Sequence, residues 1–176
     1  MLYVVDKVRG VTCLDNIMYV VCRKSSTIRL YNTDSQSPLD IINVDGMICP
    51  HEIVVCRDDR QLYIAELDGI CRVSVDDQSY LKWLTTDESF HCWSLSLTSR
   101  RLLVTSLMAG LRQYNTTDSQ LLCVVAMPQC GGILHLGDET VRGTFVVGYS
   151  SLDWKQHAVS ELFSFGVYHT IELYQP

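Results

Sequence analysis

The chain has 176 residues, of which 47% are hydrophobic and 19% are charged, and its formal net charge is −6. This composition predicts a folded globular protein and excludes an intrinsically disordered one. The length favours a single domain. The acidic balance disfavours nucleic acid as a partner, because binding to phosphates needs a positive field.

No apolar run approaches the roughly 20 residues of a membrane span, and Asp6 interrupts the stretch in which a signal peptide would still be apolar. We therefore expect a cytoplasmic protein that has no membrane partner. Its eight cysteines are then expected to be reduced thiols.

Strand-like runs bounded by turn residues follow one another along the chain in groups of four. The first three groups comprise residues 10–14, 17–23, 27–33 and 39–44, then 52–57, 61–67, 69–75 and 80–86, then 93–98, 101–107, 110–116 and 121–127. A fourth group begins with 133–136 and 144–150. The joints between runs are rich in Asp, Asn, Ser and Gly, which favour turns. No segment predicts a helix.

The chain also repeats itself: "IRLYNTDSQ" at 28–36 returns as "LRQYNTTDSQ" at 111–120. Four short antiparallel strands that recur every 40 or so residues are typical of propeller blades. We therefore expect an all-β fold, a β-propeller of about four antiparallel four-stranded blades, open or incomplete. The expected domain spans 1–176, with blades at about 10–46, 47–86, 87–127 and 128–176.

Closure of the ring is the open question at this stage. Residues 1–9 are a candidate closing strand, because they resemble the outer strand of a further blade. The tail at 165–176 alternates apolar residues and is expected to add a last strand that pairs with this N-terminal segment. The alternatives are a piece of a longer propeller, or self-association if the ring is incomplete.

Residues 50–76 resemble an NHL repeat, with Pro50, "LYIAE" at 62–66 and Arg72 at the positions where that pattern has its Pro, second strand and Arg. The other blades keep the second strand but lack the Pro, and Glu52 replaces the usual Gly. WD-repeat proteins are the second resemblance, although no Trp-Asp pair ends a third strand. Both resemblances imply a propeller and leave its role open.

One basic residue falls on the third run of each blade: Arg29, Arg72, Arg112 and, in the fourth, Lys155. These residues form either a basic ring that holds an acidic partner or a set of packing contacts between sheets. We favour packing, because repeats preserve contacts at matched positions.

Two sets of loops are expected to build one face of the propeller, namely those between consecutive blades and those between second and third strands. The expected partner-binding residues on these loops are Arg23, Lys24, Met47, His51, Phe90, His91, Trp93 and Met108. Aromatic and Met side chains of this kind are common at interfaces. The other interpretation is that Phe90 and Trp93 fill the gap between blades.

No catalytic centre, metal site or cofactor site is predicted. His51, His91 and His135 recur about once per blade but fall out of register, and adjacent His91 and Cys92 point to opposite faces of a strand. The sequence contains no Cys-x-x-Cys pair and no phosphate-binding glycine loop.

These observations predict a non-enzymatic scaffold that binds protein partners of unknown identity through its loop face. The alternatives are a propeller enzyme with a metal or acidic site at the axis, with Glu52, Glu66 and Asp68 as the candidates, and an RNA-binding propeller that uses the Arg residues of the third strands.

Overall fold

A computed structural model describes residues 7–86, 90–98, 100–106, 109–125, 130–135, 142–149 and 167–174. The prediction of an all-β fold is confirmed, because every regular element in these ranges is a strand. The strands of the first half are β1 (Val8–Leu14), β2 (Ile17–Cys22), β3 (Thr27–Asn32), β4 (Pro38–Asn43), β5 (Glu52–Cys56), β6 (Gln61–Glu66), β7 (Gly69–Ser74) and β8 (Tyr80–Thr85). They are followed by β9 (Cys92–Thr98), β10 (Arg101–Ser106), β11 (Gly110–Asn115), β12 (Leu121–Val125), β13 (Cys130–His135), β14 (Arg142–Tyr149) and β15 (Val167–Tyr174).

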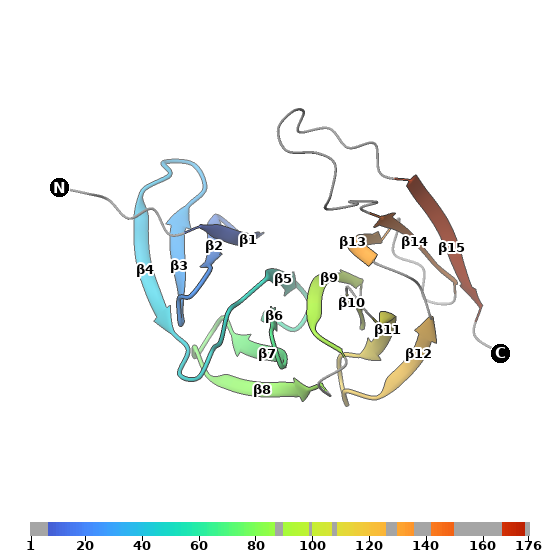
Figure 1. The fold of residues 1–176 in the computed structure, drawn as a ribbon. Helices are drawn as coiled ribbons and strands as arrows, with labels where there is room; N and C mark the ends of the chain where they lie inside the picture. Colours follow the sequence, from blue (N-terminus) through green and yellow to red (C-terminus); the bar gives the residue numbers. More distant parts are fainter. Residues whose placement is uncertain are drawn as a thin grey trace, which may run out of the picture.

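The strands form separate antiparallel sheets in simple chain order, which we call blades 1 to 4. Blade 1 is β1–β4, blade 2 is β5–β8 and blade 3 is β9–β12, while blade 4 has three described strands, β13–β15. The first strands of consecutive blades contact one another, β1 with β5, β5 with β9 and β9 with β13. Figure 1 shows these strands gathered towards a common centre, with β4, β8 and β12 at the periphery. This radial arrangement is that of a propeller.

The repeated phrase of the sequence corresponds to the same turn in blades 1 and 3. In blade 1, Asn32 Oδ1 accepts hydrogen bonds from the backbone N–H groups of Asp34 and Ser35 after strand β3. In blade 3, Asn115 Oδ1 accepts from the N–H of Thr117 at 2.9 Å after strand β11. An Asn at this place caps the turn with its side chain, and this explains why both blades carry it.

Two apolar clusters hold the first three blades together, one in each gap between neighbouring sheets. The cluster between blades 1 and 2 includes Leu14, Tyr19, Ile28, Ile53 and Leu62, and the cluster between blades 2 and 3 includes Tyr63, Ile70, Phe90, Leu102 and Tyr114. Trp83 lies edge-on to Tyr63 and Tyr114 in the second gap. Alternate residues of β6 and β7 therefore face opposite neighbours, so blade 2 is covered on both sides.

The third-strand arginines are not equivalent, which corrects the sequence interpretation. Arg29 pairs with Val20 and Arg112 with Val104, the fourth residue of the preceding strand in each blade. Arg72 pairs with Tyr63, the third residue of β6. Because neighbouring residues of a strand point to opposite faces, this offset of one residue turns Arg72 to the other side of its blade. Lys155 lies outside the described residues.

The described residues cover only part of the closing arrangement that was expected for the two ends of the chain. Val8 and Arg9 belong to β1 and extend along β2, and residues 1–6 lie outside the described ranges. The tail does supply a strand, β15, but this strand pairs with β14 of its own blade.

The side of blade 1 that faces away from blade 2 keeps apolar side chains in solvent. Val11 is 49% exposed and Ile41 is 51% exposed. Their strand neighbours Gly10 and Ile42 face blade 2. If the protein self-associates, as expected for an incomplete ring, this surface is the one that would be covered. Self-association stays a prediction.

Candidate functional site

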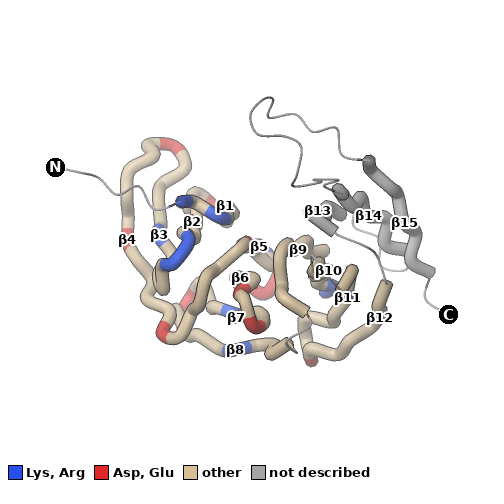
Figure 2. Tube along the Cα trace, viewed as in Figure 1, with Lys and Arg blue, Asp and Glu red and all other residues tan. Residues whose placement is uncertain are grey.

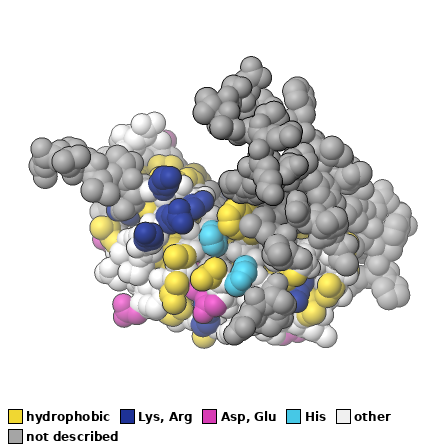
Figure 3. Space-filling model, viewed as in Figure 1, with side chains coloured by type: hydrophobic (Ala, Val, Ile, Leu, Met, Phe, Trp, Pro, Cys, Tyr) yellow, Lys and Arg dark blue, Asp and Glu magenta, His cyan; other side chains and the backbone are white. Residues whose placement is uncertain are grey.

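The face formed by the β2–β3 turn and the β4–β5 and β8–β9 loops carries most of the residues expected to bind a partner, and Figure 3 shows it from outside. Arg23, Lys24 and His91 are exposed there, while His51 and Trp93 are half-buried. Met108 lies outside the described residues.

The prediction that Met47 and Phe90 are exposed partner-binding residues is wrong. Met47 is 5% exposed and belongs to the apolar cluster between blades 1 and 2, and Phe90 is 0% exposed in the cluster between blades 2 and 3. The guanidinium of Arg112 lies 4.0 Å from the centre of the Phe90 ring, a cation–π geometry. Both side chains fill gaps between neighbouring blades, where burial removes their apolar surface from water.

His51 and Trp93 pack against each other across the gap between blades 2 and 3. Their ring centroids are 4.8 Å apart and the ring planes are tilted by 31°. His51 directly precedes β5 and Trp93 lies on β9, so the contact joins the first strands of consecutive blades. This contact fixes the His51 ring at the inner edge of the loop face.

A basic patch lies beside His51. It consists of Lys7, Arg9, Arg23 and Lys24, from the start of β1 and the β2–β3 turn. The N–H of Arg23 donates to the carbonyl of Lys7 at 2.8 Å, so the two segments lie side by side, as the blue parts of β1 and of the β2–β3 turn show in Figure 2. Figure 3 shows dark-blue Lys and Arg side chains next to histidine side chains on this face. The patch is a local concentration of positive charge on a chain of net charge −6.

Arg9 and Lys7 were missed by sequence reasoning. Between Val8 and Gly10 the register of β1 against β2 shifts by one residue, which leaves Arg9 as the extra residue of a bulge. Bulges re-aim a side chain relative to the regular strand pattern. The only local signal in the sequence is the glycine that follows Arg9, and this glycine by itself does not specify where the side chain points.

Two polar atoms at the edge of the patch are buried and have no hydrogen-bond partner among the described residues. They are Nε of Arg9 and Nδ1 of His51. Burial lowers the pKa of His51, and the positive charges of Arg9 and Arg23 and the proximity of His91 lower it further. His51 is therefore held neutral beside cations, and its Nδ1 and the Arg9 Nε–H are buried groups whose hydrogen-bonding capacity is unsatisfied among the described residues.

The lowered pKa of His51 predicts a pH-dependent loss of stability. The unfolded chain binds a proton at His51 near pH 6.5, whereas the folded chain binds it only at lower pH. The free energy of unfolding should therefore fall as the pH drops below about 6.5 and stop falling below the depressed pKa of the folded state. Chemical denaturation between pH 7.5 and 5 should show a smaller decrease for His51→Gln than for the unchanged chain. Equal decreases in both proteins would show that His51 does not contribute.

The three carboxylates proposed for an axial acidic site are each engaged elsewhere. Glu52 Oε2 accepts the backbone N–H of Leu95 at 3.0 Å and so links blade 2 to blade 3. Glu66 is 0% exposed and accepts from Lys82 Nζ at 2.7 Å, and Asp68 accepts from the same ammonium at 2.6 Å. Each of these carboxylates therefore has a hydrogen-bond partner among the described residues.

The histidines and cysteines form no cluster that fits a metal ion within the ranges that the structure describes. His91 Nδ1 lies 3.0 Å from the carbonyl oxygen of Leu67. Burial raises the pKa of the neighbouring Cys92 thiol to about 12, although Thr86 and the positive charges of Arg112 and Lys82 oppose the shift. A thiol with this pKa is protonated at neutral pH and is a poor nucleophile. The seven described cysteines are free, and none of the described segments is a helix of the length and apolarity that a membrane span requires.

Comparison with known proteins places the fold. No protein-family model and no curated protein matches the sequence. Among solved structures, the computationally designed Ika4 protein superposes with a TM-score of 0.66 at 9% identity, over 95% of this chain and 91% of that one. Hydrazine synthase from Kuenenia stuttgartiensis superposes with a TM-score of 0.70 at 10% identity, over 87% of this chain and 45% of that one. The RRP9 WD40 repeats superpose with a TM-score of 0.66 at 12% identity, over 82% of this chain and 45% of that one.

The chain is therefore a propeller-type repeat protein, similar in fold to WD40-repeat structures. It spans less than half of the length of the hydrazine synthase and RRP9 chains that it matches. Identities of 9–12% carry the likeness of fold alone.

Proposed function

We propose that the protein is a non-enzymatic binding module that holds an acidic segment of a protein partner on the basic patch. We also propose that its blades are related to NHL repeats, on the basis of the resemblance of residues 50–76 to that repeat. The observation that carries this proposal is the patch itself, Lys7, Arg9, Arg23 and Lys24 beside His51, on a chain whose net charge is −6. A basic patch steers and orients a partner of opposite charge.

The arrangement of the patch favours a carboxylate-bearing peptide over RNA. Single-stranded RNA is held by exposed aromatic rings on which its bases stack. Beside the patch, the Trp93 ring is already engaged with His51. Arg9 is half-buried, which restricts the position of its guanidinium group, and the exposed Arg23 and Lys24 side chains adapt around it. A short acidic stretch matches this combination.

Charge reversal on the patch tests the proposal. A fluorescein-labelled peptide of twelve residues, rich in Asp and Glu, is titrated with the protein and its anisotropy is measured. Combined Arg23→Glu and Lys24→Glu substitution should weaken binding by about tenfold, since each exposed charge pair contributes about 0.2–1 kcal/mol and reversal also adds repulsion. Binding to the unchanged chain should weaken as salt is raised.

Arg57→Glu is the matched control. Arg57 is exposed in the turn at the opposite end of blade 2, where its guanidinium donates to the carbonyl of Cys13 at 3.3 Å. The control changes net charge without changing the patch and should leave the peptide affinity nearly unchanged. Arg57→Glu reverses one charge, so it is compared with Arg23→Glu alone, and equal losses in these two single variants would mean that the peptide senses only overall charge. Tighter binding of a single-stranded RNA oligonucleotide than of the peptide would favour the RNA alternative.

A further inference from the structure

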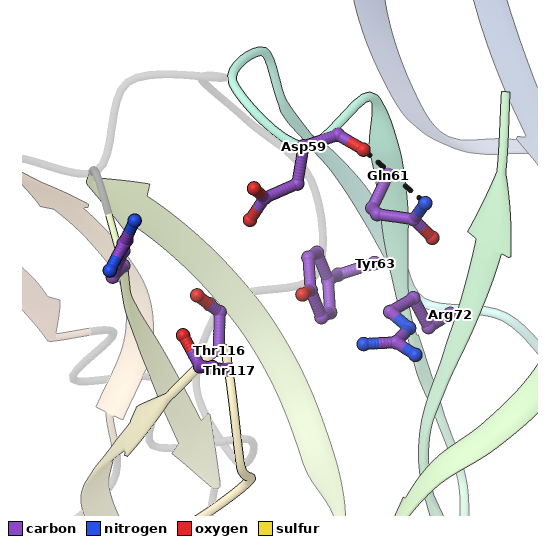
Figure 4. A pocket seen from close by; sticks show the side chains of 7 residues that line it. Asp59, Gln61, Tyr63, Arg72, Thr116 and Thr117 are labelled. Atoms are coloured by element: carbon purple, nitrogen blue, oxygen red, sulfur yellow. Dashed lines mark hydrogen bonds between the residues drawn. The ribbon is translucent and has the colours of Figure 1, made fainter.

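A second candidate site lies at the opposite end of the blades, away from the loop face. It is a partly open cavity of about 330 Å³ between blades 2 and 3. Its lining residues come from the turns β5–β6, β9–β10 and β11–β12 and from strands β6 and β7: Asp59, Gln61, Tyr63, Arg72, Arg100, Thr116 and Thr117. Figure 4 shows Tyr63 and Arg72 on one wall and Thr116 and Thr117 on the other, turned towards the same space. Neither the sequence pattern nor the proposed partner-binding role accounts for this site.

The register of blade 2 brings Arg72 into this cavity. Arg72 and Tyr63 are cross-strand partners and so project from the same side of the sheet, towards blade 3. Arg29 and Arg112 occupy a different register position and do not line the cavity. The offset that separates Arg72 from the other third-strand arginines is therefore the feature that creates a basic wall here.

The cavity is lined by several strong hydrogen-bond donors. Arg72 and Arg100 contribute two guanidinium groups, and Tyr63, Thr116 and Thr117 contribute three hydroxyls. Burial raises the pKa of Tyr63, against the opposing effect of the adjacent Arg72, so the phenol keeps its proton at neutral pH.

Asp59, which supplies the one carboxylate among the lining residues, also interacts within the β5–β6 turn. Asp59 Oδ2 lies 3.6 Å from the thiol sulfur of Cys56, which donates to it. The backbone carbonyl of Asp59 accepts from Gln61 Nε2 at 3.3 Å, as Figure 4 shows. Two fixed positive charges against one negative charge leave the cavity with a net positive charge.

Thr116 provides a second, independent indication of a ligand. Thr116 as a whole residue is 2% exposed, and its Oγ1 has no hydrogen-bond partner among the described residues. The Thr116 backbone N–H donates to the carbonyl of Arg100 at 2.9 Å, which ties the two turns of this wall together. A buried hydroxyl without a partner is unfavourable and calls for an explanation. A ligand oxygen that accepts from it satisfies this need.

We propose that this cavity binds a phosphoryl group, presented by a phosphorylated side chain of a partner or by a small phosphate ester. A phosphoryl group brings three terminal oxygens and up to two negative charges, which match two guanidinium groups and several hydroxyls better than the two oxygens of a carboxylate. The volume of about 330 Å³ lies at the lower end of small-ligand sites and leaves room for the group that carries the phosphate.

Calorimetric titration of the 176-residue chain with three probes tests this proposal. We expect saturable binding of O-phospho-L-serine and weaker binding of inorganic phosphate, because only the ester fills the remaining volume. Equal affinities for these two probes would support phosphoryl recognition with free phosphate as the ligand. Binding of L-aspartate as tight as that of O-phospho-L-serine, or no heat with either phosphate probe, would overturn the proposal.

Arg72→Gln should weaken the binding of O-phospho-L-serine by about tenfold or more, since hydrogen bonds to charged groups are the strong ones. The matched control is Arg23→Gln, which removes one positive charge from the loop face and should leave this affinity unchanged. In the acidic-peptide titration, Arg23→Gln should weaken binding and Arg72→Gln should leave it unchanged. The two proposed sites are therefore tested independently. An equal loss of O-phospho-L-serine affinity in both variants would contradict the assignment.

Thr116→Val separates a ligand-binding hydroxyl from a structural one. Valine has nearly the same shape and removes only the hydroxyl. If Oγ1 serves the ligand, the variant should bind O-phospho-L-serine about threefold to tenfold more weakly, while its thermal midpoint without ligand is unchanged or higher. A lower midpoint with unchanged affinity would show that the hydroxyl is a structural group and would remove it from the site.

Discussion

Replacement of Lys82 by methionine should lower the free energy of unfolding by about 3 kcal/mol. Lys82 Nζ donates to Glu66 Oε2 at 2.7 Å and to Asp68 Oδ1 at 2.6 Å. Burial lowers the pKa of Lys82, but the hydrogen bonds to Asp68 and Glu66 outweigh burial and raise it. The Glu66 side chain has no exposed surface, so the substitution leaves a buried carboxylate without its cation. Urea denaturation followed by circular dichroism measures the change.

A double-mutant cycle distinguishes the ion pair from simple loss of packing. Glu66→Gln removes the buried charge and keeps the shape, so Glu66→Gln combined with Lys82→Met should recover most of the stability that Lys82→Met loses. Asp68→Asn is the matched control, because Asp68 is the exposed partner of the same ammonium and exposed pairs contribute little. Additive losses in the double variant would contradict a coupled buried pair.

Gly10→Ala should destabilise the protein by about 2 kcal/mol or more, because it forces blades 1 and 2 apart. A Cβ atom on Gly10 would lie 2.7 Å from the backbone nitrogen of Ile53 and 2.9 Å from Cα of Glu52. Both atoms are backbone atoms of β5 and cannot move aside without moving the strand. The thermal midpoint and the hydrogen exchange of the β5 amides should both report the change.

Gly46→Ala is the control, because it replaces a glycine by alanine at a position where the added Cβ meets no other atom. Gly46 has a φ of +84° and no atom within 4 Å of its added Cβ, so its substitution costs only the backbone strain, about 1 kcal/mol. A loss for Gly10→Ala no larger than that for Gly46→Ala would mean that blades 1 and 2 do not pack as closely as described.

The packing of consecutive blades also explains why the loop face differs from the expected one. Met47 and Phe90 stand on loops and carry apolar side chains, which is a pattern typical of interface residues. The loops are short, however, and the gaps below them are lined by Ile53 and Ile70 of blade 2. Burial in such a gap removes more apolar surface from water than an exposed position does, so these side chains turn inwards.

The charged residues of both candidate sites were harder to predict than the strands. Arg23 and Lys24 were predicted on the loop face and are exposed there. Arg9 reaches this face from a bulge, and a register offset of one residue places Arg72 in the wall of the cavity that Arg100 also lines. A shift of one position in a strand moves a side chain to the opposite face of the sheet, and the local composition predicts neither of these two shifts.

The sequence by itself determined the strands, the turns and the period of about four strands per repeat, because alternation of apolar residues and turn chemistry act over a few neighbouring residues. It therefore also determined that the sheets stack as propeller blades, since each blade in the middle has two apolar faces to cover. Only the tertiary structure decided which arginine faces which gap, which loop side chains are buried, and which groups converge at the patch and in the cavity. These properties depend on register and on contacts between residues distant in the chain, and local sequence does not encode them.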